Sequence, residues 1–230
     1  MCYNLPRMDA TATTGRQLHV ALDAHLLSGR AGYRSAGVHQ YIYNLLRHLK
    51  PSADLRYTVL LGAGKLPPGV ALPVRRTAWP TDRATVRVLW EQLAQPGVLR
   101  RLRADLVHGP AFVGPLAAAC PAVITIHDLS FLRFPHLFRP ANRLYLTVMT
   151  RLSARRARRL IAVSEHAAAE SSLLLSVPRE RIDVVYHGCD PAFRPLPPQD
   201  VEEFRRRHRL PRRFVLSVGT LEPRKNHVRL

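Results

Sequence analysis

Residues 17–49, QLHVALDAHLLSGRAGYRSAGVHQYIYNLLRHL, contain the pattern that decides the fold. The apolar run Leu18–Leu22 predicts a strand that ends at Asp23, and the small residues of 28–37 predict a loop. Residues Gly37–Leu49 are expected to form a helix, because their apolar members recur at helical spacing. These members are Val38, Ile42, Leu45, Leu46 and Leu49. A strand, a glycine-containing loop and a helix in this order are typical of a parallel α/β sheet.

The rest of the chain repeats this alternation of short apolar runs and helical stretches. Further strands are predicted at Tyr57–Leu61, Val74–Ala78, Asp105–His108, Val123–Ile126, Leu160–Val163 and Ile182–Tyr186. Helices fill most of the intervals between them. The sequence therefore predicts an α/β protein with a Rossmann-like, doubly wound parallel sheet that is covered on both faces.

Proline content divides the chain near its C-terminal end. We assign residues 1–16 to a disordered polar tail and residues 17–190 to the Rossmann-like domain. Residues 191–211 are interpreted as a linker that includes a short charged helix. The linker prolines are Pro191, Pro195, Pro197 and Pro198. Residues 212–230 are expected to hold the first strand, Phe214–Val218, and the following loop of a second domain, because they are too few to form a core of their own.

The formal net charge of +19 comes almost wholly from arginine, since the sequence has only three lysines. Such a charge attracts nucleic acid, acidic lipid or nucleotide phosphates, but arginines that are merely solvated on outward faces give the same composition. Five arginines cluster at positions 151, 155, 156, 158 and 159. They suit the negative end of a helix dipole, and contact with an anionic membrane is the alternative interpretation.

The cysteines and the hydropathy of the chain indicate the cellular compartment of the protein. Cys2, Cys120 and Cys189 lie far apart and show no metal or redox spacing, which favours a reducing compartment. Residues 1–17 lack the apolar centre of a secretory signal. The uncharged run Ala111–Ile126 is shorter than the ~20 residues that cross a bilayer, and prolines interrupt it. We therefore expect a cytoplasmic protein, with peripheral contact at the inner face of the membrane as an alternative.

Two candidate ligand loops follow predicted strands at the edge where doubly wound sheets bind their ligands. Gly37 opens a helix whose free N–H groups and positive dipole end suit an anion. His127 and Asp128 follow the strand Val123–Ile126. The imidazole suits a sugar hydroxyl or developing charge, whereas Asp128 equally suits a turn or helix cap.

Two more loops complete the candidate edge. Ser164 follows the strand Leu160–Val163, and an N-cap role is its simplest explanation. His187 and Gly188 follow the last predicted strand of the domain. They border the linker, so we expect them to face any cleft between two domains.

Residues 219–226, Gly-Thr-Leu-Glu-Pro-Arg-Lys-Asn, resemble the GTLEPRKN signature that opens the donor domain of family 4 glycosyltransferases. Other segments similar to family features follow in the family's order: Ala36–Tyr41, Trp90-Glu91-Gln92, His127-Asp128-Leu129, Ser164 and Tyr186-His187-Gly188. The resemblance covers the chain from about residue 17 to the last residue. It implies the N-terminal, acceptor-side half of a GT-B fold, followed by the start of the donor-binding half.

The resemblance implies transfer of a hexose of the mannose or rhamnose type from a nucleotide-sugar to an alcohol, with retention of anomeric configuration. Lys225 and Arg224 would hold the donor diphosphate, with Gly37 approaching it from the other domain and His127 at the sugar end. Arg224 is the candidate for the second positive charge, because Thr220 stands where many relatives have arginine. No metal and no cofactor are implied, since basic side chains and helix dipoles stabilise the leaving diphosphate.

The implied partners are the nucleotide-sugar and a glycan or lipid-linked acceptor. We expect this chain to be inactive by itself, because the acidic pair that binds the donor in the family would lie further along a second domain. Two alternatives stay open: an arginine-rich nucleic-acid-binding α/β protein, and another GT-B enzyme such as a sugar-nucleotide epimerase. The few aromatic residues argue against nucleic acid, and the signature at 219–226 argues against the epimerase.

Overall fold

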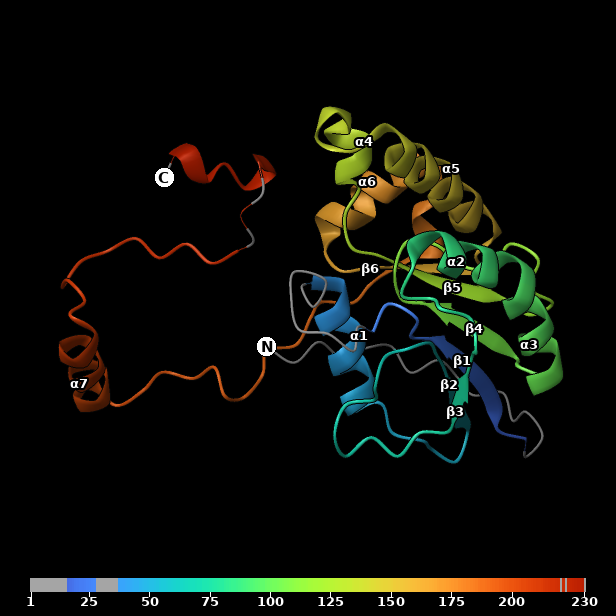
Figure 1. The fold of residues 1–230 in the computed structure, drawn as a ribbon, viewed down its shortest axis with the longest axis horizontal. Coiled ribbons are helices and arrows are strands. Elements are labelled where there is room, and N and C mark those ends of the chain that lie inside the picture. The colour runs from blue at the N-terminus through green and yellow to red at the C-terminus, as the bar shows by residue number, and fades with distance from the viewer. Residues whose placement is uncertain (1–15, 28–36, 220, 222, 230) are drawn as a thin grey trace. The chain divides into compact units, whose positions relative to one another are not determined.

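The computed structural model describes residues 16–27, 37–219, 221 and 223–229. The chain divides after Val185 into two compact units, close to the predicted start of the linker. The first unit contains a seven-stranded sheet in the order β3-β2-β1-β4-β5-β6-β7, and every neighbouring pair is parallel (Figure 1). The strands are β1 (Leu18–Asp23), β2 (Leu55–Leu61), β3 (Val74–Arg76), β4 (Leu106–Gly109), β5 (Ala122–Ile126), β6 (Arg159–Ala162) and β7 (Ile182–Val184). The predicted Rossmann-like parallel sheet is confirmed.

Helices connect these strands. They are α1 (Gly37–His48), α2 (Ala84–Leu89), the π-helical turn η2 (Trp90–Ala94), α3 (Gln95–Leu102), α4 (Ser130–Arg133), η3 (Pro135–Leu137), α5 (Pro140–Arg156), α6 (Glu165–Leu175) and η4 (Arg179–Arg181). Proline is the first residue of α5, where its missing N–H costs no helical hydrogen bond. α2, η2 and α3 follow one another without interruption, so the π-helical turn is a bulge inside one helical stretch.

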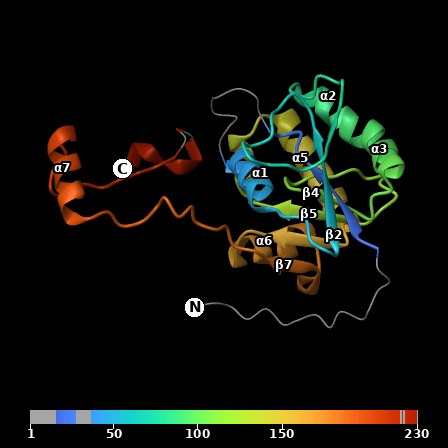
Figure 2. The same ribbon diagram turned by 90° about the horizontal axis from the view of Figure 1, so that it is seen from below.

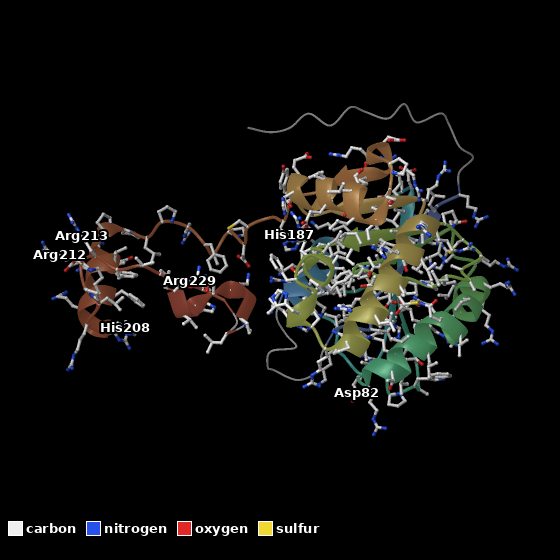
Figure 3. All side chains as sticks on the ribbon, turned by 90° about the horizontal axis from the view of Figure 1, so that it is seen from above. Asp82, His187, His208, Arg212, Arg213 and Arg229 are labelled. Carbon is white, nitrogen blue, oxygen red and sulfur yellow. The ribbon has the colours of Figure 1, made fainter. Side chains whose placement is uncertain are left out.

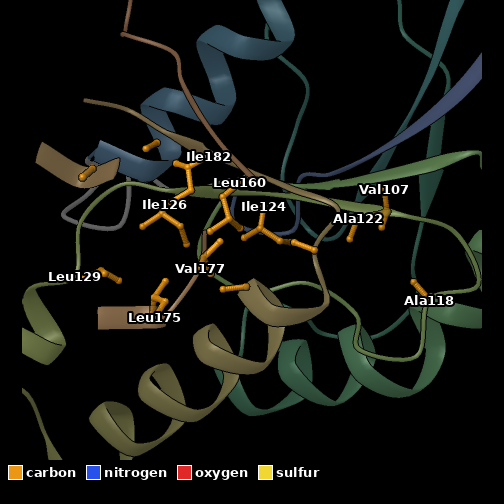
Figure 4. Close-up of a cluster of buried hydrophobic side chains, with 14 of the residues drawn as sticks. Val107, Ala118, Ala122, Ile124, Ile126, Leu129, Leu160, Leu175, Val177 and Ile182 are labelled. Atoms are coloured by element: carbon orange, nitrogen blue, oxygen red, sulfur yellow. The ribbon is translucent and has the colours of Figure 1, made fainter. Parts of the chain in front are cut away.

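The two faces of the sheet pack against different helices. Alternate residues of a strand point to opposite faces, and Val20 and Leu22 of β1 pack in one cluster with Ile42 and Leu46 of α1. Ala21, between them, belongs to the opposite cluster. That second cluster also holds Val107, Ile124, Leu160 and Ile182 from the strands and Leu99, Ala154 and Leu175 from α3, α5 and α6 (Figure 4). α1 accordingly lies on one side of the sheet, and α3 and α5 lie on the other (Figure 1, Figure 2).

The second unit comprises residues 186–230. It contains α7 (Pro198–His208), η5 (Pro223–Lys225) and η6 (His227–Arg229). The charged helix predicted within the linker is therefore present. The strand predicted at Phe214–Val218 is wrong, because these residues are exposed and pair with no strand in the described part of the chain. An apolar, β-favouring run becomes a strand only where another strand offers it hydrogen bonds.

Candidate functional site

The strand order identifies one edge of the first unit as the place for a ligand. The order reverses between β1 and β4, and open α/β sheets bind ligands outside the carboxyl ends of their strands at such a reversal. Asp23 is the last residue of β1, and His108 lies one residue before the end of β4. His127 comes directly after β5, the next strand of the sheet. Three titratable side chains thus belong to neighbouring strand ends.

His127 is held by its ring nitrogen and by two aromatic rings. Its Nε2 lies 2.8 Å from the carbonyl oxygen of Pro110, which can only accept, so Nε2 carries a proton and donates. In the neutral ring the lone pair is then on Nδ1. The rings of Tyr41 and Phe112 pack edge-on against the imidazole, with centroids 4.8 and 5.7 Å away. The hydrogen bond and the packing fix both the tautomer and the plane of the ring.

Tyr41 connects helix α1 to this edge. Its hydroxyl lies 3.3 Å from Thr125 Oγ1, and the same Oγ1 atom of Thr125 lies 2.9 Å from His108 Nε2. Burial raises the pKa of Tyr41, so the phenol stays protonated at neutral pH. Gly37 begins the same helix one turn before Tyr41. The structure therefore brings the start of α1, predicted as a phosphate site, to the strand end that carries His127.

His108 is neutral at physiological pH. Burial lowers its pKa to about 4, with a further lowering by the neighbouring His127, and the negative charge of Asp23 only partly opposes this. A neutral imidazole both accepts and donates hydrogen bonds, so it can share the Thr125 hydroxyl without adding charge to the edge. His108 thus supports Thr125 and, through it, Tyr41.

A second group of polar residues surrounds the end of β1; we call Asp23, His25, Glu91 and Gln95 the acid cluster. The Asp23 carboxylate accepts hydrogen bonds from the backbone N–H of His25 at 3.0 Å, from His25 Nδ1 at 2.8 Å and from Gln95 Nε2 at 3.1 Å. The His25 ring also packs on Trp90, with centroids 3.9 Å apart. His25 Nε2 and Gln95 Oε1 are buried without a hydrogen-bond partner among the described residues. The cluster joins the loop after β1 to the helical stretch around η2.

The pKa values of the two carboxyl groups in the acid cluster are shifted in opposite directions. Burial opposes ionisation of Asp23, but the charge and hydrogen bonds of His25, with the bond from Gln95, outweigh it and lower the pKa of Asp23. Burial and then the charge of Asp23 raise the pKa of Glu91 to about 8, against a smaller opposite effect of Arg87. Glu91 is only 7% exposed. Asp23 is therefore charged and Glu91 mostly neutral at pH 7, as expected where two carboxyl groups share one buried region.

The family profile of Glycosyltransferase Family 4 matches residues 35–193, more than half of the chain. The chain belongs to Glycosyltransferase Family 4. The matched residues run from just before α1 to just past the end of the first unit, so they include Tyr41, His108, His127 and the acid cluster residues Glu91 and Gln95. The family resemblance read from the sequence is thereby confirmed.

Two known proteins illustrate the relationship. O-antigen chain mannosyltransferase B of Escherichia coli is 29% identical over 134 residues, which are 57% of this chain and 35% of that protein. Crystal structures of HepE from Anabaena with UDP and with UDP-glucose superpose with TM-scores of 0.54 and 0.53, at 18% and 19% identity. Each match covers 84% of this chain and 50% of HepE. The chain thus spans about a third to a half of the length of these proteins, and the structural likeness supports the GT-B fold class.

Two of the predicted site residues of this family member also have local structural roles. Ser164 is the N-cap of α6, and its hydroxyl accepts a hydrogen bond from the backbone N–H of Ala167 at 3.1 Å. The Asp128 carboxylate accepts from the backbone N–H of Ser130 at 2.9 Å and so forms the turn into α4. Both residues follow strands at the carboxyl edge, and their contact with a ligand stays a prediction.

The remaining predicted residues belong to the second unit or lie outside the described residues. His187 and Gly188 are exposed and follow β7 along the chain. Lys225 is exposed at the end of η5, whereas the side chain of Arg224 is not among the described ones. The loop at 28–36 and Thr220 likewise lie outside the described residues. The roles of Lys225, Arg224, His187 and Gly188 therefore stay predictions.

In residues 16–27, 37–219, 221 and 223–229, no three His, Cys, Asp or Glu side chains are gathered as metal ligands would be. No helix in that part of the chain is both long and apolar enough to cross a bilayer.

Sequence reasoning missed the acid cluster and the Tyr41–Thr125–His108 chain. In the sequence, Trp90-Glu91-Gln92 is only a run similar to a family feature, and nothing in its pattern places Glu91 beside Asp23. One available signal was Asp23 itself, since a carboxylate at the end of a buried strand requires hydrogen-bond donors. The other was the position of Tyr41, one helical turn after the predicted phosphate-binding glycine.

Proposed function

We propose that this protein transfers a hexose of the mannose or rhamnose type from a nucleotide-sugar to an alcohol group of a glycan or lipid-linked acceptor, with retention of anomeric configuration. Membership of Glycosyltransferase Family 4 supports the transferase class. The relative named as an O-antigen chain mannosyltransferase supports the mannose type and a glycan acceptor. The HepE structures with UDP and UDP-glucose support a nucleotide-sugar as donor.

The observation that carries the proposal is the fixed imidazole of His127 at the carboxyl edge of the sheet. Its Nε2 proton is committed to the carbonyl oxygen of Pro110, and Tyr41 and Phe112 hold the ring plane. A ring fixed in this way suits a hydrogen bond to a sugar hydroxyl or to charge near the anomeric carbon. The fold already holds the imidazole in one orientation, so the ring does not have to reorient when the sugar binds.

In the proposed reaction the bond between the anomeric carbon and the diphosphate oxygen breaks, and the acceptor oxygen forms the new glycosidic bond on the same face. The acceptor proton leaves with the diphosphate. Lys225 and Arg224 neutralise the diphosphate, and the N-terminus of α1 at Gly37 faces it with free N–H groups. Asp128, Ser164, His187 and Gly188 are proposed to line the cleft. Neither a metal nor a cofactor is part of the proposal.

Saturation-transfer NMR tests the proposal at the level of binding. We keep the expectation that this chain transfers no sugar by itself, so GDP-, UDP- and dTDP-hexoses and mannose-terminated glycans are titrated instead. We expect saturation of hexose protons that His127→Ala abolishes and that His136→Ala, a change at an exposed histidine of η3, leaves intact. Binding of none of these sugars, or equal loss in both variants, would refute the assignment. Turnover by this chain would support the transferase and overturn only the expected inactivity.

A further inference from the structure

Helix α5 presents an apolar stripe to solvent. Leu144, Val148 and Leu152 recur every four residues, which places them on one side of the helix, and they are 65%, 43% and 40% exposed. The opposite side of α5, with Ala154, is buried in the core of the first unit. Phe134, which lies between α4 and η3, and Leu137, in η3, are also exposed large apolar residues just before α5. Figure 1 shows α4 and α5 together on the outer side of the first unit.

Arginines are interleaved with this stripe. Arg151 and Arg155 follow Val148 and Leu152 by three residues each, so they lie on the same side of the helix, and both are exposed. The sequence of α5 contains no Asp or Glu, and no ion pair of the described residues engages Arg151 or Arg155. We call Leu144, Val148, Arg151, Leu152 and Arg155 the α5 face.

Charge alone does not distinguish this face. Basic side chains cover much of both units, as Figure 3 shows, and α3 also exposes Arg100 and Arg101. What distinguishes the α5 face is the alternation of guanidinium groups with large apolar side chains that are 40% to 65% exposed. A nucleic acid would use only the charges, and a packed protein interface would bury them without the carboxylates that they need. The boundary of an anionic bilayer takes both kinds of side chain, since phosphates meet the guanidinium groups and acyl chains meet the leucines.

We propose that the α5 face docks on the surface of an anionic lipid bilayer. α5 follows β5 and returns the chain to the start of the parallel strand β6, so its first turns lie at the carboxyl edge of the sheet, where His127 is. Docking through Leu144 and Val148 therefore brings the bilayer beside the candidate site. The value of this arrangement for a lipid-linked acceptor rests on the proposed function, but the docking itself does not depend on sugar transfer.

Vesicle sedimentation tests the docking with matched variants of the whole chain. The vesicles are phosphatidylcholine alone or with about 30% phosphatidylglycerol, at low and physiological salt. Arg151→Gln with Arg155→Gln should weaken binding to the anionic vesicles about 10- to 30-fold at low salt, because each arginine near such a surface contributes several-fold. Arg100→Gln with Arg101→Gln removes the same charge from α3 and should weaken binding at most about threefold. Equal losses in the two pairs would refute a specific face and indicate diffuse charge.

The apolar half of the face is tested separately. Leu144→Ser with Val148→Ser should weaken binding to anionic vesicles about tenfold, whereas Leu173→Ser, a change at the 76% exposed leucine of α6, should leave it within about twofold. Far-UV circular dichroism confirms that each variant is folded. Unchanged binding of the Leu144/Val148 variant would refute insertion of the stripe. A wild-type dimer that this variant dissociates would assign the face to a second copy instead, and a parallel loss of duplex DNA binding in the Arg151/Arg155 variant would assign it to nucleic acid.

The docking proposal and the transferase proposal can be refuted independently of each other. Vesicle binding needs no nucleotide-sugar, so a chain that binds anionic vesicles through α5 but shows no hexose saturation would leave the docking standing and remove the proposed function. Hexose saturation without selective vesicle binding would leave the proposed function standing and refute the docking.

Discussion

Replacing Glu91 with glutamine perturbs the acid cluster at the carboxyl end of β1. Glutamine keeps the shape of the neutral carboxyl group but cannot ionise. Burial, together with the charge of Asp23, raises the pKa of Glu91 from 4.5 to about 8 in the folded protein, so between these values the folded protein holds a proton that the unfolded chain has lost. This stabilising proton is fully present below pH 4.5, and its contribution falls as the pH rises toward 8.

His108 has the opposite effect on the pH dependence of the free energy of unfolding, and this limits the pH range in which the effect of Glu91 can be measured. Burial lowers its pKa from 6.5 to about 4, so the unfolded chain binds the extra proton between these values and stability rises with pH. Between pH 4.5 and 6.5 the effects of Glu91 and His108 therefore oppose each other, and His19, whose pKa burial also lowers, acts in the same direction as His108. Among the described groups with a shifted pKa, Glu91 is the one that titrates between pH 6.5 and 8, and about 1.5 pH units at about 1.4 kcal/mol per unit give a loss of about 2 kcal/mol in the wild type.

Urea denaturation at pH 6.5, 7.25 and 8 measures this loss directly. The free energy of unfolding of Glu91→Gln should stay level across the window, so the variant gains about 2 kcal/mol relative to the wild type by pH 8. Glu180→Gln, a change at an exposed glutamate of η4, should follow the wild type. Parallel curves for the wild type and Glu91→Gln would refute the reasoning, because Glu91 would then ionise alike in the folded and unfolded states.

Substitutions at three more residues test the carboxyl edge of the sheet. In any form of the protein that turns over, His127→Ala should lower kcat by ~10² to 10⁴ and leave nucleotide affinity within a few fold, since its partner is the sugar; near-normal kcat in steady-state assays would contradict this. Tyr41→Phe removes the hydroxyl that contacts Thr125 and should cost about 1 kcal/mol in urea denaturation, while an unchanged midpoint would show that the contact contributes nothing. Ser164→Ala removes the cap of α6 and should cost about 1 kcal/mol, most of which Ser164→Asp should restore; equal losses in both would argue against capping.

The central strands were predictable because β1, β4 and β5 are short, mainly apolar runs that end at or just before a polar or glycine residue. Val123–Ile126, for example, corresponds to β5, and the histidine and aspartate after it mark the carboxyl edge. His127 and Gly37 could therefore be assigned to one edge from order alone, since parallel strands end on the same side. Phe214–Val218 has the same apolar composition but no partner strand among the described residues, and composition cannot supply one.

The acid cluster could not be predicted, because its members come from distant parts of the chain. Asp23 and His25 lie about 70 residues before Glu91 and Gln95, and the contact depends on how the helical stretch of α2, η2 and α3 crosses the end of β1. The π-helical turn that carries Glu91 gives no periodic signal in so short a segment. A raised carboxyl pKa is a property of that three-dimensional enclosure and not of the sequence WEQ.

Histidine-selective ¹³C NMR during titration with nucleotide-sugars tests the central claim most directly, namely that the edge bearing His127 receives the sugar. The account predicts a saturable shift of the His127 resonance with at least one hexose donor and little change at the exposed His136 of η3. A donor that binds while the His127 resonance stays in place would contradict it.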